Sequence, residues 1–290
     1  MGQPWFSAKG REIHYKRRPL IMGVVNVTTD SFYDGGRYVE SERAIAHALE
    51  LVEQGAGIID RGGESARPGA CPVSEQDELA HMIPVVKGLV HRVSVPISID
   101  TSKSRVAEVA LDYGASIIND VSALRQDPAM ASVIARFDAA VVLMHMQGTP
   151  QTMQQSPQYS DVVGEVVRFL EGRVQMALRA GIAGTNILLD PGFGFGKLVN
   201  HNLDLLDGLS AIAALNRPVL VGLSRKAFIG NVVERPVEHR EWGTAAAVAL
   251  AVDRGAHILR VHDVAMMIDV VKMAAALNPR WSSYRQEHDA

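Results

Sequence analysis

The sequence is short of cysteine and of long apolar runs, and each shortage excludes a class of protein. Cys71 is the only cysteine, so an internal disulfide and a cysteine-rich metal site are both excluded. No uninterrupted apolar run reaches the ~18 residues that a membrane-spanning helix needs. The first residues include a basic stretch but no apolar segment typical of a signal peptide. We therefore expect a cytoplasmic protein without a membrane partner.

An excess of charge and the common metal motifs are missing as well. The 290 residues include 29 Lys and Arg against 32 Asp and Glu, a balance that gives no support to nucleic-acid binding. The sequence has neither an H-E-x-x-H motif nor an EF-hand loop, which argues against a dedicated structural metal site. What remains is a globular protein, and 47% hydrophobic residues suffice for a large core.

Strand-like and helix-like segments alternate along the chain. Apolar, β-branched segments predict eight buried strands, at residues 21–27, 58–60, 95–100, 116–120, 139–146, 187–190, 218–223 and 256–261. Apolar residues at helical spacing predict helices at 41–54, 76–93, 104–113, 129–137, 161–180, 203–215, 241–254 and 264–277.

Parallel strands are covered on both faces and so read as continuous apolar runs, as these strands do. Eight strand–helix units predict a (β/α)8 TIM barrel in a single domain, residues 1–290, and an open doubly wound sheet is the alternative. The pattern of residues 1–18 predicts an N-terminal extension, either a polar leader or an edge hairpin.

A polar residue stands near the end of each predicted strand. In a barrel these ends meet on one face, where active sites form. An unpaired buried polar group costs ~1–3 kcal/mol, so eight such residues in phase with the strands indicate a functional site. Carboxylates and amides suit a ligand with several N–H donors, whereas cations with His262 suit an anion such as phosphate. The eight residues are Asn26, Asp60, Asp100, Asn119, His145, Asp190, Lys226 and Arg260.

The stretch D-P-G-F-G-F-G-K, residues 190–197, follows one of these strands. Pro191 cannot continue a central strand, and the glycines allow the backbone to approach a ligand closely. The spacing matches neither a dinucleotide fingerprint nor a P-loop, so an anion cradle and a tight turn both stay open. Two further polar, glycine-rich loops, residues 28–36 and 62–70, are typical of segments that cover a site.

Eight motifs, in order along nearly the whole chain, resemble the signatures of the dihydropteroate synthases. The resemblance implies a (β/α)8 barrel, usually a homodimer. It also implies that 6-hydroxymethyl-7,8-dihydropterin pyrophosphate condenses with para-aminobenzoate to give dihydropteroate and pyrophosphate in folate biosynthesis. Mg²⁺ is the implied cofactor, and sulfonamides compete with para-aminobenzoate, which makes the family an antibiotic target. The motifs are residues 22–36, 62–70, 100–103, 117–120, 145–150, 190–197, 224–226 and 260–263.

The resemblance also implies a role for individual residues. The pterin is assigned to Asp100, Asn119, Asp190, Lys226 and Arg260. The pyrophosphate is assigned to Asn26, Arg67, Arg260 and His262, with Mg²⁺ at Asn26. The para-aminobenzoate pocket is assigned to Phe32, Pro68, Phe195, Ser224 and Ala227, and the catalytic set is Asp34, Lys226 and Arg260. Because the pyrophosphate is assigned to other residues, we expect Lys197 to reach solvent or a neighbouring carboxylate rather than a phosphate.

Five positions depart from the usual pattern of the family: Thr29, Tyr33, Arg61, Ala66 and Ala227. Most are assigned near the second substrate, which suggests an altered affinity for para-aminobenzoate or sulfonamides with activity retained. Arg61 replaces an apolar residue and, if Asp60 faces the barrel interior, must pair or extend to solvent.

Two other functions stay open. One is a methyltetrahydrofolate methyltransferase, which would share the pterin residues but has no use for a pyrophosphate site. The other is a non-catalytic paralogue that keeps pterin binding. Met266, Met267 and Met273 are expected to serve helix packing rather than a partner site.

Overall fold

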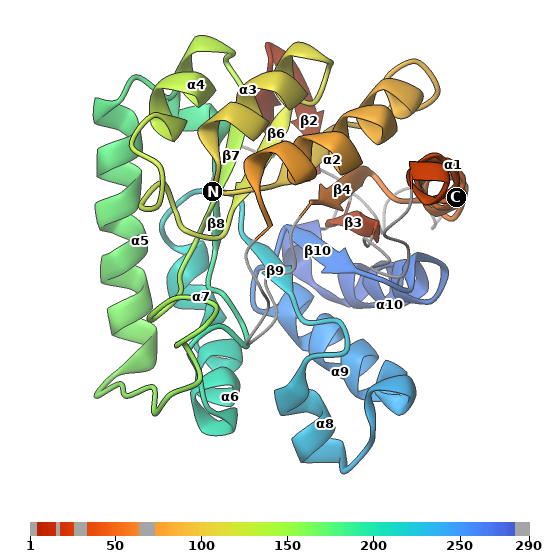
Figure 1. The fold of residues 1–290 in the computed structure, drawn as a ribbon. Helices are drawn as coiled ribbons and strands as arrows, with labels where there is room; N and C mark the ends of the chain where they lie inside the picture. The colour runs from red at the N-terminus through yellow and green to blue at the C-terminus, as the bar shows by residue number, and fades with distance from the viewer. Residues whose placement is uncertain (1–4, 16–17, 26–33, 64–72, 282–290) are drawn as a thin grey trace.

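The computed structural model describes residues 5–15, 18–25, 34–63 and 73–281, without the side chains of residues 34–38. Eight parallel strands pair in the order β8-β7-β6-β5-β4-β3-β10-β9. An isolated parallel bridge between Leu189 and Val219 joins the two edge strands, so the predicted barrel is confirmed over an open sheet (Figure 1). The strands are β3 (Leu20–Val25), β4 (Ile58–Gly62), β5 (Ile97–Asp100), β6 (Ile117–Asp120), β7 (Ala140–Met144), β8 (Ile187–Asp190), β9 (Leu220–Gly222) and β10 (Ile258–Val261).

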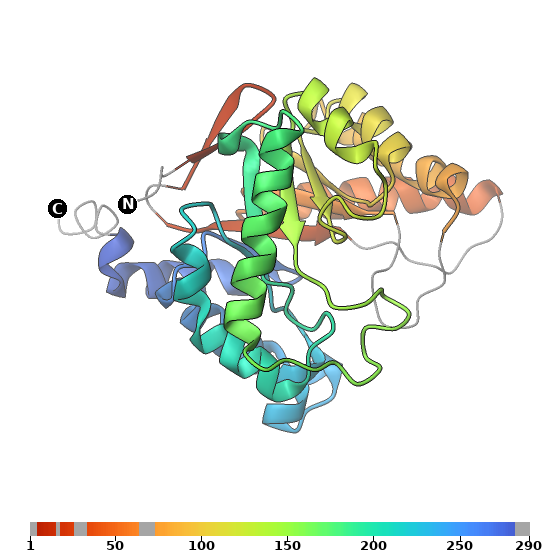
Figure 2. The same ribbon diagram turned by 90° about the vertical axis from the view of Figure 1, so that its left-hand side faces the viewer.

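Helices surround the strands, and α5 crosses in front of them in Figure 2. The predicted helix at 203–215 is two helices, α6 (Val199–Asp207) and α7 (Leu209–Ala213). The sequence gave no prediction for α8 (Ala227–Val233). The other helices are α1 (Asp34–Glu53), α2 (Glu75–Leu89), α3 (Ser104–Asp112), α4 (Met130–Arg136), α5 (Val162–Arg179), α9 (Glu241–Asp253) and α10 (Val264–Leu277). Three 3-10 turns are Gly184–Asn186, Val237–His239 and Pro279–Trp281.

The N-terminal extension forms a hairpin of β1 (Trp5–Ala8) and β2 (Arg11–His14), antiparallel to each other. Phe6 is fully buried against the core. Lys9 donates its backbone N–H to the carbonyl of Asp138, just before β7 begins, at 2.7 Å. The hairpin therefore packs at the N-terminal end of the strands, opposite the predicted site.

The core is formed by the strands and the inner faces of the helices. Met267 on α10 is fully buried, as expected, but Met273 on the same helix is 63% exposed. The expectation that Met273 serves helix packing was therefore wrong, because it lies on the outer face of α10. No helix in the described part of the chain is long and apolar enough to cross a membrane.

Candidate active site

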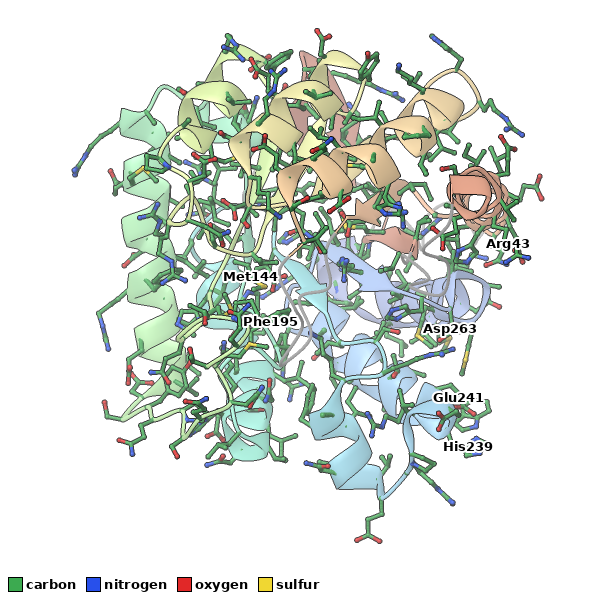
Figure 3. All side chains as sticks on the ribbon, in the orientation of Figure 1. Arg43, Met144, Phe195, His239, Glu241 and Asp263 are labelled. Atoms are coloured by element: carbon green, nitrogen blue, oxygen red, sulfur yellow. The ribbon has the colours of Figure 1, made fainter. Side chains whose placement is uncertain are left out.

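The C-terminal ends of the strands surround a small cavity that opens to solvent. All five residues assigned to the pterin lie in its wall, although they come from five different strands or strand ends. The apolar part of the wall includes Met144 and Phe195, which Figure 3 labels near the middle of the molecule. The full lining is Asp100, Asn119, Val121, Met144, Asp190, Phe193, Phe195, Gly222, Lys226 and Arg260.

Strand register brings these residues to one level. Asp100 on β5 is the Cα partner of Asn119 on β6. Arg260 on β10 is the partner of Gly222 on β9, and a Cβ at Gly222 would meet open space. Because Gly222 has no side chain, the cavity extends into the space beside Arg260.

Arg260 is held by two carboxylates. Its Nε donates to Asp60 Oδ2 at 2.7 Å, and its Nη2 donates to Asp100 Oδ2 at 3.1 Å. Ser98 Oγ donates to the other Asp60 oxygen at 2.6 Å, and Asp60 is fully buried. The sequence placed Asp60 at a strand end but gave it no role, and the structure makes it the fixed partner of Arg260.

Burial shifts the pKa of Asp100, Asp190 and Lys226 toward 7. It raises the pKa of Asp100 to about 7, against the attraction of Arg260. Burial also raises the pKa of Asp190, against a hydrogen bond from the Gly192 N–H at 2.7 Å. It lowers the pKa of Lys226 to about 8, and the repulsion from Arg260 adds to the effect. Groups of this kind can both donate and accept hydrogen bonds near pH 7.

The pKa of Asp100 predicts a pH dependence of stability. Its folded pKa, about 7, lies above the ordinary value of 3.8, so the folded state keeps a proton that the unfolded state loses. The free energy of unfolding should therefore fall as pH rises from about 4 to about 7. Asp100→Asn should remove this part of the decline, as measured by urea unfolding across that range.

Asp112→Asn is the matched control, because Asp112 is exposed at the end of α3 and should leave the profile unchanged. Equal slopes for the wild-type protein and Asp100→Asn would show that Asp100 does not retain its proton in the folded state.

The loop after β8 is a tight turn that lines the cavity. Its backbone donors are used within the protein: Gly192 N binds Asp190 Oδ1 and Gly194 N binds Asn202 Oδ1, both at 2.7 Å. Of the two interpretations that the sequence left open, the structure supports the turn rather than an anion cradle.

Lys197, at the end of this loop, was expected to reach solvent or a carboxylate, and that prediction was wrong. It is 3% exposed, and its Nζ lies 2.9 Å from His145 Nδ1. Burial lowers the pKa of His145 to about 3, so the ring is neutral and its Nδ1 can accept from the ammonium. Burial also lowers the pKa of Lys197 to about 7. The loop folds back over the side chain, which explains why it does not reach solvent.

Ser224 and His262 meet beside the cavity rather than in its lining. Ser224 Oγ lies 2.9 Å from His262 Nδ1 and accepts from the His262 backbone N–H at 3.3 Å. Ala227 is the first residue of α8 and follows Lys226 directly. Phe195, assigned to the para-aminobenzoate pocket, lines the same cavity as the residues assigned to the pterin.

Arg61 pairs within the protein and does not extend to solvent. It is 4% exposed, and its Nη1 donates to the Val25 carbonyl at 3.3 Å. Burial lowers its pKa to about 10, although the nearby Glu40 carboxylate opposes the shift.

Several predicted residues lie outside the part of the chain that the structure describes: Asn26, Phe32, Arg67 and Pro68 of the assigned site, and Thr29, Tyr33 and Ala66 of the departures. Asp34 is the first residue of α1, and its side chain is also outside the description. Among the described residues, no three His, Cys, Asp or Glu side chains gather as a metal site.

The sequence missed part of the cavity wall. Val121, Met144, Phe193 and Gly222 line it without carrying a charge or a polar side chain. Met144 directly precedes His145, which the sequence singled out, and is the register partner of Asp190. Only the pairing of β7 with β8 indicates that Met144 faces the cavity.

A barrel that places acids, an amide and two cations around a small cavity at its strand ends has the architecture of a TIM-barrel enzyme. Residues 22–262 match the family model described as "Pterin binding enzyme". The dihydropteroate synthase of Bacillus subtilis is 44% identical over 269 residues, covering 93% of this chain and 92% of that protein.

Solved structures agree. The Xanthomonas albilineans synthase with 4-aminobenzoic acid has a TM-score of 0.87 and 46% identity, over 96% of this chain and 98% of that one. The Yersinia pestis synthase with a sulfonamide drug has a TM-score of 0.88 and 42% identity, over 94% of this chain and 98% of that one. The chain belongs to the dihydropteroate synthases, a family of transferases among the pterin-binding enzymes.

Proposed function

We propose that the protein condenses 6-hydroxymethyl-7,8-dihydropterin pyrophosphate with para-aminobenzoate in folate biosynthesis. The observation that carries the proposal is the cavity in which the five residues assigned to the pterin meet. Asp190 and Asn119 supply acceptors for the ring N–H and exocyclic amine of a pterin, and Lys226 supplies a donor for its carbonyl or ring nitrogen.

Arg260 contributes a planar cation whose direction is fixed before substrate arrives. Asp60 and Asp100 bind two of its nitrogens, so the guanidinium needs no reorganisation to face the charge that develops in the reaction. In the proposed mechanism the C–O bond at the pterin methylene breaks first, the pterin delocalises the cation, and the amine then attacks. No side chain acts as a covalent nucleophile, and Asp34 is proposed to stabilise the positive charge.

The pyrophosphate is proposed to bind Asn26, Arg67, Arg260 and His262. An amide oxygen together with phosphate oxygens is a donor set that suits Mg²⁺, which usually takes few protein ligands. Bound at Asn26, Mg²⁺ would neutralise charge on the leaving pyrophosphate.

Para-aminobenzoate is proposed to bind Phe32, Pro68, Phe195, Ser224 and Ala227. The ligands of the Xanthomonas and Yersinia enzymes, 4-aminobenzoic acid and a sulfonamide, support this second substrate and its competitor. We also propose a single cytoplasmic domain that forms a homodimer. Exposed apolar side chains on α9 and α10 support the dimer: Trp242, Leu250, Met273 and Leu277.

An assay of pyrophosphate release tests the function. Release should require para-aminobenzoate and should be accompanied by dihydropteroate. Pterin binding without release would indicate the non-catalytic paralogue, and methyl transfer from methyltetrahydrofolate would indicate the methyltransferase. Either result would overturn the proposal.

The departures in the two glycine-rich loops predict altered binding of the second substrate. Thr29→Pro restricts the loop in the unfolded chain, and Ala66→Thr restores a hydroxyl that is usual in the family. We expect each variant to change the KM for para-aminobenzoate or the sulfonamide inhibition constant by about two- to tenfold, with kcat nearly constant. If neither quantity changes in either variant, the departures have no such effect.

A further inference from the structure

The loop after β8 carries side chains on which two other cavity residues depend. Phe195 lines the cavity, and the Lys226 Nζ lies 4.1 Å from the centroid of its ring. A Cβ at Gly194, in the same loop, would come to 3.1 Å from Lys226 Cδ. The course of this loop therefore determines the position of Lys226 as well as of Phe195.

The backbone of the loop has an unusual conformation. Gly192, Gly194 and Gly196 have φ values of +70°, +78° and +60°, which an alanine would adopt only with strain. A Cβ at Gly192 would also collide with the His145 carbonyl. Because the glycines leave the loop backbone flexible, side-chain contacts must hold it in this conformation.

Lys197 supplies the central restriction. Its Nζ donates to the carbonyls of Gly192 at 2.9 Å and Phe195 at 3.0 Å, and its third neighbour is His145 Nδ1 at 2.9 Å. Three acceptors satisfy all three N–H bonds of an ammonium group. The side chain therefore joins the two ends of the turn and ties them to the residue that follows β7.

Neutral side chains hold the remaining carbonyls of the turn. Tyr159 OH donates to Gly196 O at 2.7 Å, and Gln154 Nε2 donates to Gly194 O at 2.8 Å. Both donors come from the segment between β7 and α5, and each holds one carbonyl. Lys197 differs because it is buried, charged and bound to two loop carbonyls together.

We propose that Lys197 is a positioning residue for the pterin site: it holds the turn after β8 so that Phe195 faces the cavity and supports Lys226. The proposal rests on the proposed pterin site. Lys197 itself is not in the cavity wall, so its effect on the pterin is transmitted by Phe195.

A double-mutant cycle tests this route. Lys197→Met keeps the length and removes the donors, and it should weaken binding of 6-hydroxymethylpterin by on the order of tenfold, because small misplacements of site residues are costly. Phe195→Ala should weaken binding at least as much. The double variant should bind no more weakly than Phe195→Ala alone, because Lys197 acts through that ring.

The measurement is calorimetric titration with 6-hydroxymethylpterin, beside steady-state KM values for both substrates. Lys272→Met is the control, since Lys272 is exposed on α10 and pairs there with the exposed Asp269, and it should bind like the wild-type protein. If Lys197→Met does not fold, Lys197→Gln, which keeps two N–H donors, replaces it and should show a smaller loss.

Two results would overturn the inference: wild-type affinity in the Lys197 variant, or losses that multiply in the double variant. A different result would show that the proposed pterin site itself is wrong. In that case Asp190→Asn and Asn119→Ala would also bind 6-hydroxymethylpterin like the wild-type protein.

Discussion

Lys226→Ala is expected to lose most turnover while the protein keeps its fold. The amine lines the cavity over Phe195, and among the described residues it forms no ion pair within 4 Å. Its removal thus breaks no direct ion pair, although it takes away a cation that attracts the buried Asp190 carboxylate. Loss of a preorganised donor costs about 10²–10³-fold in turnover, and we expect kcat/KM to fall by that order.

Pyrophosphate release measures the turnover, and thermal unfolding measures the fold. Lys272→Ala removes an exposed lysine and should leave both unchanged. Asp100→Asn should also lose most turnover, because Asp100 lines the same cavity and binds Arg260. Wild-type activity in both purified site variants would remove these residues from the proposed function.

Arg260→Met is expected to lose stability as well as activity. The substitution leaves Asp60 fully buried with Ser98 Oγ as its one hydrogen-bond donor among the described residues, and it also removes the cation beside Asp100. Breaking a buried ion pair by removing one partner costs ~3–5 kcal/mol. We expect a loss of this size in the free energy of unfolding, measured with urea at pH 7.

The double variant Arg260→Met with Asp60→Asn separates the two effects. It removes the buried charge that Arg260→Met leaves unpaired, so most of the stability should return. Turnover should stay low, because the guanidinium is still missing. Equal instability in the single and double variants would show that the Asp60 charge is not the cause.

The contrast between Lys226 and Arg260 comes from their partners. Both are cations at strand ends, and the sequence assigned both to the pterin and to catalysis. Only the structure shows that Arg260 is tied to two carboxylates, one of them 200 residues away. Sequence separation of that size carries no local pattern, so the pairing could not be predicted.

The sequence alone determined the barrel and the identity of the residues around the cavity. Buried strands and amphipathic helices depend on local apolar spacing, which is why Ile187–Asp190 and Val264–Leu277 were predicted with their exact bounds. The polar residues were predicted because each follows an apolar strand, and only the resemblance to the dihydropteroate synthases assigned five of them to the pterin. Helix α8 and the split of α6 from α7 were missed, although α4, which is as short as α8, was predicted.

The tertiary structure alone decided the direction of individual side chains. Lys197 turns inward because the glycines let the loop fold over its side chain. The loop carbonyls then accept the hydrogen bonds that water would otherwise accept from the Lys197 ammonium. Met144 joins the cavity through the register of β7 and β8, and Met273 is exposed because α10 turns that side away from the core. The contact of Lys197 with His145 and the register of Met144 join segments distant in sequence, which barrel closure sets and local residue patterns do not contain.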